Sequence, residues 1–166
     1  MDPQAIFDNY RRILSRHYFD MNGRVGRPEF WYFVLANLLA SILASIVGGI
    51  VHLPLGEIYN LGVLLPSMSI GARRLQDIGR DGRLAWLLLI LIGVTQIVGI
   101  LTALTFVFAG LFGLLFVPGL SALGLATLVV GVVLIYFWCQ PGDPGPNAYG
   151  PVPPVFDPSA RVSPSP

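Results

Sequence analysis

The sequence predicts an all-α membrane protein: a four-transmembrane-helix bundle with an N-terminal interfacial amphipathic helix and a disordered Pro-rich C-terminal tail. Hydrophobic residues make up 54% of its 166 residues and charged residues only 11%, against roughly one quarter in soluble domains. The charges also gather in short segments that separate long apolar runs. Nucleic-acid binding needs a clustered surplus of positive charge, and because the charges of this chain nearly cancel, we expect no nucleic-acid partner.

The N-terminal segment, residues 1–29, is predicted to be amphipathic and cytoplasmic. Within it, residues 3–19 predict a helix, since Asp2 suits its N-cap and Pro3 its first turn. Apolar side chains recur there with a helical period. We expect this helix to lie in the membrane interface, with ordinary packing against protein as the alternative. Its expected apolar face consists of Ile6, Phe7, Tyr10, Ile13, Leu14, His17 and Tyr18.

The first span is predicted at residues 30–51, where Pro28 and Glu29 suit the first helical turn. A helix of this length crosses a hydrocarbon core of about 30 Å. Small residues recur at every fourth position and predict a helix-packing stripe. This stripe consists of Ala36, Ala40, Ala44 and Gly48. Asn37 beside it is expected to serve packing, with a solute pathway as the alternative.

The second span, about residues 53–72, is shorter. Pro54 and Glu57 are expected in its first turn, and Pro66 predicts a kink. Gly79 predicts the helix end. Asp81 is expected to N-cap the next helix.

From residue 84 to residue 138 the chain carries no formal charge. This length is too great for one span and predicts two, at about 84–106 and 116–138, joined by a turn near residues 108–115. Small or weakly polar residues in these spans are expected at helix contacts. They are Gln96, Ser121, Gly124, Thr127 and Gly131. The four spans form a predicted membrane domain over residues 30–139.

Orientation follows from the arginines, which precede the first span and separate the second from the third. The positive-inside rule makes both segments cytoplasmic, and four spans then place the C-terminus there as well. Residues 140–166 read as a cytoplasmic tail rich in Pro and Gly. We expect turns or polyproline-like structure first, and disorder over residues 152–166.

The stretch "RRLQDIGRDG" and the preceding "NGRVGRPEF" supply a candidate charged cytoplasmic cluster. Asp77 falls near a helix C-terminus, where the dipole disfavours an anion, so we expect guanidinium groups beside it. A helix that continues past Arg73 would carry Asp77 and either Arg80 or Asp81 on the same face. The cluster consists of Arg24, Arg27, Arg73, Arg74, Asp77, Arg80 and Asp81.

Three roles are open to this cluster. The first is structural, an ion-pair knot that fixes the angle between the second and third spans. In the second, its spare arginines bind an anionic headgroup or phosphate. In the third, Asp77 acts in catalysis or as a proton relay, although no His, Cys or second buried carboxylate is expected to share that work.

Three blocks of sequence carry a resemblance to a known family. They are "YFDMNGRVGRPEFWYF", "LLPSMSIGARRLQDIGRDGRLAWLLL" and "CQPGDPGPNAYGP". In this order and spacing they resemble the signature blocks of the bacterial inner-membrane family catalogued as domain of unknown function 805, over roughly residues 7–151. The resemblance implies a multi-pass protein of the bacterial inner membrane and no established activity. The family pattern has Leu-His-Asp where this chain has Leu75, Gln76 and Asp77, which weakens a proton-transfer role, and its usual Ser-Gly-Trp is Asp-Gly-Arg at residues 81–83.

The function expected from these observations is a non-enzymatic membrane module that associates with itself, with lipid or with another envelope protein. Its expected partners are membrane lipids, including anionic headgroups, and a second copy or an envelope protein. No catalytic, cofactor or metal site is expected, because Cys139 and both histidines are isolated. The alternative is a small transporter or channel subunit, suggested by Asn37, Gln96 and the Pro66 kink. An enzyme that acts on lipids ranks third.

Overall fold

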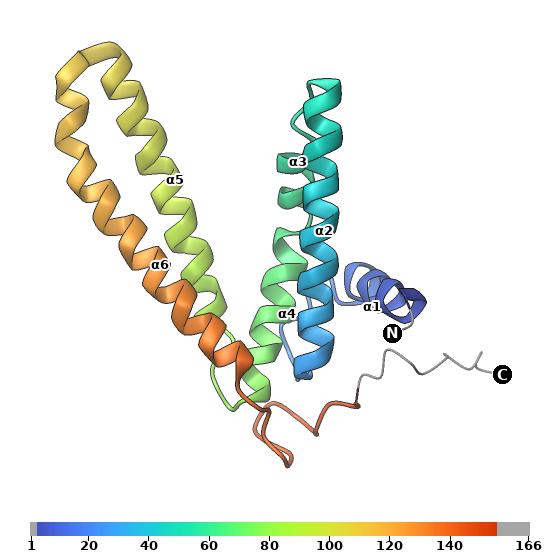
Figure 1. The fold of residues 1–166 in the computed structure, drawn as a ribbon. Coiled ribbons are helices and arrows are strands. Elements are labelled where there is room, and N and C mark those ends of the chain that lie inside the picture. Colours follow the sequence, from blue (N-terminus) through green and yellow to red (C-terminus); the bar gives the residue numbers. More distant parts are fainter. Residues whose placement is uncertain (1–2, 156–166) are drawn as a thin grey trace. The chain divides into compact units, whose positions relative to one another are not determined.

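The computed structural model describes residues 3–155, which are helical apart from connecting loops and one isolated β-bridge between Asn147 and Gly150 (Figure 1). The predicted N-cap at Asp2 and residues 156–166 of the predicted disordered tail lie outside this range. The elements in chain order are α1 (Pro3–Arg16), α2 (Arg27–Val51), α3 (Leu55–Gly62), α4 (Leu64–Asp77), α5 (Leu84–Ala109), the 3₁₀ helix η1 (Gly110–Phe116) and α6 (Val117–Cys139).

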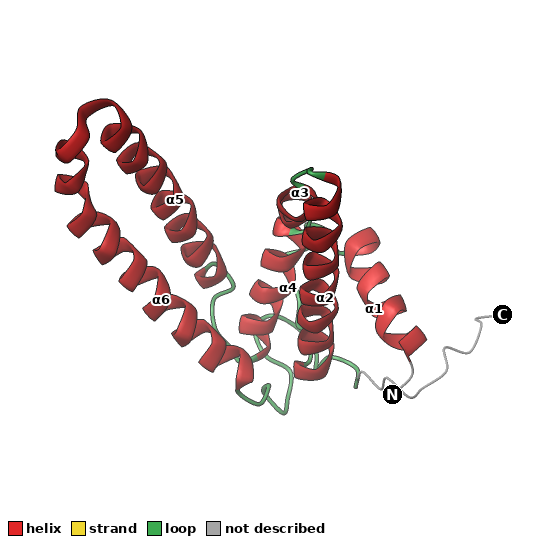
Figure 2. Ribbon diagram, turned by 45° about the horizontal axis from the view of Figure 1, so that its top comes forward, coloured by secondary structure: helices red, strands yellow, loops and turns green. Residues whose placement is uncertain are grey.

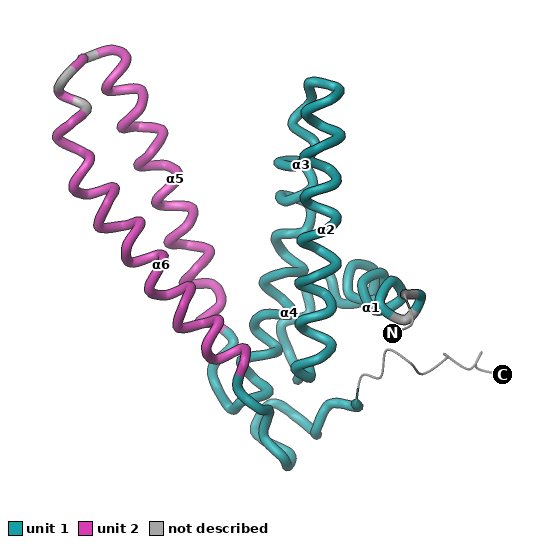
Figure 3. Tube along the Cα trace, viewed as in Figure 1, with its two compact units in different colours: residues 1–82, 140–166 teal, residues 83–139 magenta. Residues whose placement is uncertain are grey.

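The chain forms two compact units, coloured separately in Figure 3. Unit 1 comprises residues 1–82 together with 140–166, and it contains α1 to α4. Unit 2 comprises residues 83–139, a hairpin of α5 and α6 joined through η1. Unit 1 is therefore built from two stretches of chain that are separated in sequence by the whole of unit 2.

Within residues 3–155, three helices are long and apolar enough to cross a membrane: Arg27–Val51, Leu84–Phe108 and Leu114–Cys139. They correspond to the first, third and fourth predicted spans, and η1 forms the predicted turn between the last two. The second predicted span is divided into α3 and α4 (Figure 2). Neither piece alone has the roughly 20 residues that a crossing needs, so helix length does not confirm a fourth span.

The division between α3 and α4 is the interruption that Pro66 predicts. The break lies at Val63, and Pro66 falls in the first turn of α4. A proline ring clashes with the carbonyl four residues earlier, which here belongs to Gly62, and it has no N–H to offer that carbonyl. The Tyr18 hydroxyl supplies the missing donor at 2.6 Å from the Gly62 oxygen.

Small residues bring α2 and α3 into close contact, and Gly48 of the predicted stripe is one of them. A Cβ at Gly48 would lie 2.5 Å from the Leu53 carbonyl oxygen, and a Cβ at Gly56 would overlap the Ser45 side chain. The Ser41 hydroxyl also donates to Asn60 Oδ1 at 2.9 Å. In the stripe itself Gly48 is buried, and the other members are half-buried, namely Ala36, Ala40 and Ala44.

Helix α4 ends where Gly79 predicts. Gly79 has a left-handed φ of +70°, and its N–H and that of Arg80 donate back to the Gln76 and Leu75 carbonyls at 3.2 and 2.9 Å. This pair of bonds is a Schellman motif. The predicted N-cap at Asp81 is wrong, because α5 begins at Leu84 with Arg83 as its N-cap.

In unit 2, α5 and α6 meet along a seam of small and weakly polar residues. Thr95 and Thr127 hydroxyls lie 3.2 Å apart, and the Leu88 side chain covers Gly131 at 3.9 Å from a Cβ built there. Thr127 and Gly131 thus lie at the helix contact as predicted. Gln96 and Ser121 are both exposed and do not lie at this contact. The Ser121 hydroxyl donates instead to the Val117 carbonyl within its own helix. Gly124 is half-buried, with open space around a Cβ built there.

Helix α1 is amphipathic, as expected, although it ends at Arg16 and not at residue 19. Its Ile13 is buried against the rest of unit 1, whereas Phe7 is 61% exposed. The position of this helix in a membrane interface stays a prediction. The hydrophobic core of unit 1 lies where α1, α2 and α4 meet and includes Ile13, Val25, Phe30, Phe33, Ile70 and Leu75.

Candidate functional site: a buried arginine clamp

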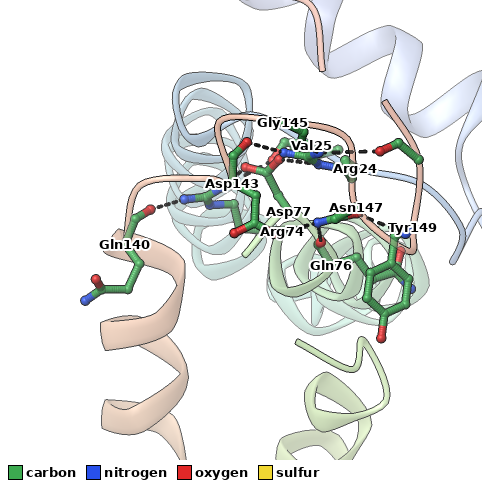
Figure 4. Close-up of polar contacts among 11 residues, drawn as sticks. Arg24, Val25, Arg74, Gln76, Asp77, Gln140, Asp143, Gly145, Asn147 and Tyr149 are labelled. Carbon is green, nitrogen blue, oxygen red and sulfur yellow. Dashed lines mark hydrogen bonds and ion pairs between the residues drawn. The ribbon is translucent and has the colours of Figure 1, made fainter. Parts of the chain in front are cut away.

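Three members of the predicted charged cluster come together at the C-terminal end of α4 (Figure 4). Arg24 Nε donates to Asp77 Oδ1 at 2.9 Å, and Arg74 NH1 donates to Asp77 Oδ2. All three side chains are almost completely buried, with exposed fractions of 1% for Arg24, 0% for Arg74 and 3% for Asp77. Asp77 thus holds two guanidinium groups, one on each carboxylate oxygen.

The segment that follows α6 completes the shell around these charges. Arg24 donates to the backbone carbonyls of Asp143, Gly145 and Gly150 at 2.7, 2.6 and 3.4 Å. Arg74 donates to the Gln140 carbonyl. We call Arg24, Arg74 and Asp77, with the backbone of residues 140–150, the arginine clamp.

The clamp also fixes the backbone on both sides of Asp77. The Asp143 N–H donates to the Asp77 carbonyl at 2.8 Å. Asn147 Nδ2 donates to the Gln76 carbonyl at 2.9 Å and to Asp143 Oδ2 at 2.8 Å. These bonds satisfy carbonyls in the last turn of α4, which has no intrahelical donors for them.

Glycine is required at one point of close approach in the clamp. A Cβ at Gly142 would overlap the Asp77 carboxylate, which is held by both arginines. By contrast, a Cβ at Gly145 would meet nothing within 4 Å. The glycines of "PGDPGPNAYG" therefore differ in role, and Gly142 is the one that lets the segment reach the carboxylate.

The electrostatics of the clamp are those of a structural ion-pair network. Two cations and one anion leave an excess positive charge, which the aligned carbonyl dipoles of residues 140–150 accept through charge-assisted hydrogen bonds. A buried charge is strongly unfavourable unless it is paired and hydrogen-bonded. The expected compensation of Asp77 by guanidinium groups is confirmed, but its partners are Arg74 and Arg24, not Arg73.

The remaining members of the predicted cluster lie outside the clamp. Arg27 is exposed at the start of α2, and Arg80 and Asp81 are exposed in the loop after α4. Because α4 ends at Asp77, neither Arg80 nor Asp81 shares the helical face of Arg73. The clamp joins α4 to residue 24 and to residues 140–150, all within unit 1. The predicted ion-pair knot was expected instead between the second and third spans.

A second polar group lies where the loop after α1 crosses α4. Ser69 donates to the carbonyls of His17 (3.2 Å) and Asp20, and Gln76 Nε2 donates to the Met21 carbonyl at 2.9 Å.

Burial tends to raise the pKa of Asp20. Hydrogen bonds from His17 and the Asn22 N–H, with the positive charge of Arg73, outweigh it and hold the pKa below the ordinary carboxyl value.

Asn37, predicted to serve packing, sits in a hydrogen-bonded group between α1, α2 and α3. Its Oδ1 accepts from the Tyr59 hydroxyl at 2.7 Å and from the Tyr10 hydroxyl at 3.5 Å, and the two hydroxyls bond each other. Tyr10 also stacks on Phe33 with ring centroids 5.4 Å apart. Asn37 Oδ1 is therefore satisfied inside unit 1.

Sequence reasoning missed the role of residues 140–150, which it treated as the start of a tail. Their contribution is made mainly by backbone carbonyls, which every residue carries, so side-chain chemistry gave no direct signal. The signal that was present is "CQPGDPGPNAYGP" itself, a block of turn-forming residues that belongs to the family resemblance. Within residues 3–155, no group of three or more His, Cys, Asp and Glu side chains could hold a metal ion.

Comparison with known proteins supports the assignment of this chain as a membrane protein. The family described as "Protein of unknown function (DUF805)" matches residues 18–151. The chain is 28% identical over 138 residues to inner membrane protein YhaI of Escherichia coli K12, covering 81% of this chain and 86% of YhaI. It is 27% identical over 157 residues to inner membrane protein YhaH of the same strain, covering 88% of this chain and 96% of YhaH.

No solved structure matches the chain significantly. The family match spans all three blocks of the resemblance and every member of the arginine clamp. The apolar helices and the inner-membrane relatives together show that this is a multi-pass inner-membrane protein. The chain belongs to the DUF805 family.

Proposed function

We propose that this protein is a non-enzymatic inner-membrane module that associates with itself, with lipid or with another envelope protein. The observation that supports this proposal most is the burial of Arg24, Arg74 and Asp77 in mutual contact and under the backbone of residues 140–150. Groups used in this way stabilise the fold and are not accessible to a substrate. The side chains of α5 and α6 that face outward are mostly apolar, as a surface for lipid or another membrane helix requires.

We further propose that α3 and α4 together form the second of four crossings, with both termini in the cytoplasm. Helical hydrogen bonding continues across the break, since the Val63 N–H donates to Tyr59 and the Ser67 N–H donates to Val63, both at 3.0 Å. A continuous segment from Leu55 to Asp77 is long enough to cross. The two arginine-rich segments then fall on one side, which the positive-inside rule makes cytoplasmic.

Mass spectrometry of nanodiscs cut directly from the native membrane tests the association. Wild type is compared with an Arg80→Ala, Asp81→Ala variant, which changes exposed charges and leaves the clamp intact. We expect wild type to carry a stoichiometric second copy, protein partner or lipid, and this species to weaken in the variant if it docks on the charged loop. A monomer surrounded only by bulk lipid would contradict the proposal.

Lipid analysis of the same membranes tests the non-enzymatic part. Membranes with and without the wild-type protein should have the same lipid composition. A product that accumulates only in membranes that contain the protein would identify an enzyme.

Cysteine labelling tests the topology, because Cys139 is the sole cysteine of the sequence and is exposed at the end of α6. We expect a membrane-impermeant maleimide to label Cys139 in inverted vesicles and not in intact cells. A Leu53→Cys, Cys139→Ser variant should show the reverse pattern, since Leu53 lies at the other end of α2 and is exposed. If α3 and α4 do not cross, both positions will be labelled from the same side.

The alternative function, a small transporter or channel subunit, is favoured by Gln96. This side chain is exposed near the middle of α5, and polar groups at membrane depth prefer a cavity or a partner helix. Solute flux into liposomes that is present with wild type and lost with Gln96→Leu would support this function. Equal leakage with both proteins would count against it.

A further inference from the structure

Arg73 differs from its neighbour Arg74 in what its guanidinium group contacts. It lies in the last turn of α4, and its backbone carbonyl accepts a hydrogen bond from the Val25 N–H at 3.3 Å. Its side chain is half-buried, and its buried Nε has no hydrogen-bond partner. In residues 3–155 this guanidinium group makes no ion pair, so Arg73 keeps donors that the fold does not use.

Asp20 lies beside the turn of α4 that precedes Arg73, because Ser69, four residues before Arg73, donates to the Asp20 carbonyl. Two carboxylates, those of Asp20 and Glu29, act on Arg73 electrostatically, and both already have partners. Asp20 Oδ2 lies 2.9 Å from His17 Nδ1, and Glu29 is paired with Arg12. They differ in access, since the Asp20 side chain is 38% exposed and that of Glu29 only 10%. Asp20 therefore presents an accessible negative charge next to the unused positive charge of Arg73.

Both groups stay ionised near neutral pH. A guanidinium group starts from so high a pKa that it remains protonated. The carboxyl of Asp20 has a pKa below the ordinary value and is ionised. The surface at the α1–α4 junction thus carries a fixed pair of opposite charges.

We propose that Arg73 and Asp20 bind the zwitterionic headgroup of an ethanolamine phospholipid. The guanidinium fork of Arg73 matches two phosphate oxygens. Each Asp20 oxygen already accepts one hydrogen bond, from His17 or the Asn22 N–H, and retains a lone pair for the ammonium group. A quaternary choline headgroup has no N–H to donate there, and a glycerol headgroup has no positive charge.

The surroundings fit a site among lipid headgroups. The side chains next to Asp20 in the loop, Tyr18 and Phe19, are 40% and 62% exposed, and aromatic residues are enriched where membrane meets water. The inference rests on the proposed function, which places this end of unit 1 at the membrane surface. It adds the identity of one lipid partner and the two residues that select it.

Native mass spectrometry of the purified full chain, titrated with defined lipids, tests the site. We expect wild type to bind phosphatidylethanolamine about tenfold more tightly than phosphatidylcholine or phosphatidylglycerol, the ratio that one charge-assisted contact provides. Arg73→Gln should remove about tenfold of that affinity, and Arg73→Lys should remove less. Asp20→Asn should remove the preference over phosphatidylglycerol while phosphate binding remains.

Arg80→Gln is the matched control, an arginine of the loop after α4 that lies outside the proposed site, and it should bind as wild type does. Thermal unfolding without added lipid verifies that each variant is folded. Equal binding of the three lipids by wild type, or equal losses in Arg73→Gln and Arg80→Gln, would overturn the inference. Inorganic phosphate that displaces the lipid would assign the site to free phosphate and overturn it as well.

The two proposals fail separately. A lipid product that forms only in membranes containing the protein would overturn the non-enzymatic function and leave headgroup binding unaffected. Loss of the lipid preference, with a protein partner still bound in native nanodiscs, would overturn headgroup binding alone.

Discussion

Arg24 and Asp77 are separated by 53 positions in the sequence, yet Arg24 Nε lies 2.9 Å from Asp77 Oδ1 and both side chains are buried. This contact joins the loop before α2 to the end of α4. Arg24 extends the connection through its other nitrogens to the segment after α6. One arginine therefore links three parts of the chain.

Removing the clamp's only carboxylate should destabilise the protein severely. Asp77→Asn leaves Arg24 and Arg74 buried without a counter-charge, and we expect a loss of about 3–5 kcal/mol in the free energy of unfolding. Thermal or denaturant unfolding in detergent measures this loss. Asp81→Asn, an exposed carboxylate in the following loop, should change the stability by less than about 0.5 kcal/mol. Equal effects of the two substitutions would show that the clamp does not stabilise the fold.

Two glycines of the segment after α6 should respond differently to an added methyl group. Gly142→Ala places a Cβ against the Asp77 carboxylate, and we expect a destabilisation of about 1–3 kcal/mol. Gly145→Ala meets open space and keeps the carbonyl that accepts from Arg24, so it should be nearly neutral. Unfolding midpoints of the two variants, measured side by side, make the comparison. A neutral Gly142→Ala would mean that the segment approaches Asp77 less closely.

A neighbouring pair of glycines in α2 tests the α2–α3 contact. Gly48→Ala brings its Cβ to 2.5 Å from the backbone oxygen of Leu53, which cannot move aside as a side chain can. We expect a destabilisation of about 1–3 kcal/mol. Gly49→Ala has nothing within 4 Å and should gain slightly from its better helix propensity. Similar melting temperatures for the two variants would contradict the close approach.

The bond from Tyr18 to the Gly62 carbonyl can be tested with a double-mutant cycle. Tyr18→Phe leaves that carbonyl without a donor, and we expect a loss of about 1 kcal/mol. The same substitution in a Pro66→Ala background should cost less, because the new N–H at residue 66 can donate to Gly62 along the helix. Stability measured for all four proteins gives the coupling energy. Equal effects of Tyr18→Phe in both backgrounds would rule out this compensation.

Asp20 should contribute an acid-sensitive part of the stability. Its pKa is lower in the folded protein than the ordinary 3.8, although burial opposes the shift. The folded state therefore favours the ionised form, and its contribution is complete above the ordinary value and is lost as the pH falls through the lowered pKa. We expect melting temperatures between pH 5 and pH 3 to fall less steeply for Asp20→Asn than for wild type, with Asp81→Asn as the control.

The membrane helices were predictable because their signal is local. A run such as residues 30–51 is apolar over the length that a bilayer requires, and no distant contact is needed to recognise it. The end of α4 at Gly79 was predictable for the same reason, since a left-handed position favours glycine. The break before Pro66 was predictable as well, since a proline disrupts the helix at the carbonyl four residues earlier. The Tyr18 hydroxyl that bonds this carbonyl was not predictable, because Tyr18 lies far away in the sequence.

The arginine clamp was predictable only in part. Charges are so rare in this chain that Arg24, Arg74 and Asp77 stand out, and the need to compensate Asp77 follows from helix physics. Which arginine faces it could not be deduced, because Arg73 and Arg74 differ by one position and helix rotation decides between them. The segment 140–150 was missed because backbone carbonyls perform its role.

The order of the clamp's parts along the chain bears on how the protein is made. The ribosome synthesises Arg24 and Arg74 before the hairpin of unit 2, and the carbonyls that accept from both arginines only after it. A chain that ends before residue 140 therefore lacks every carbonyl that residues 140–150 offer to the two guanidinium groups.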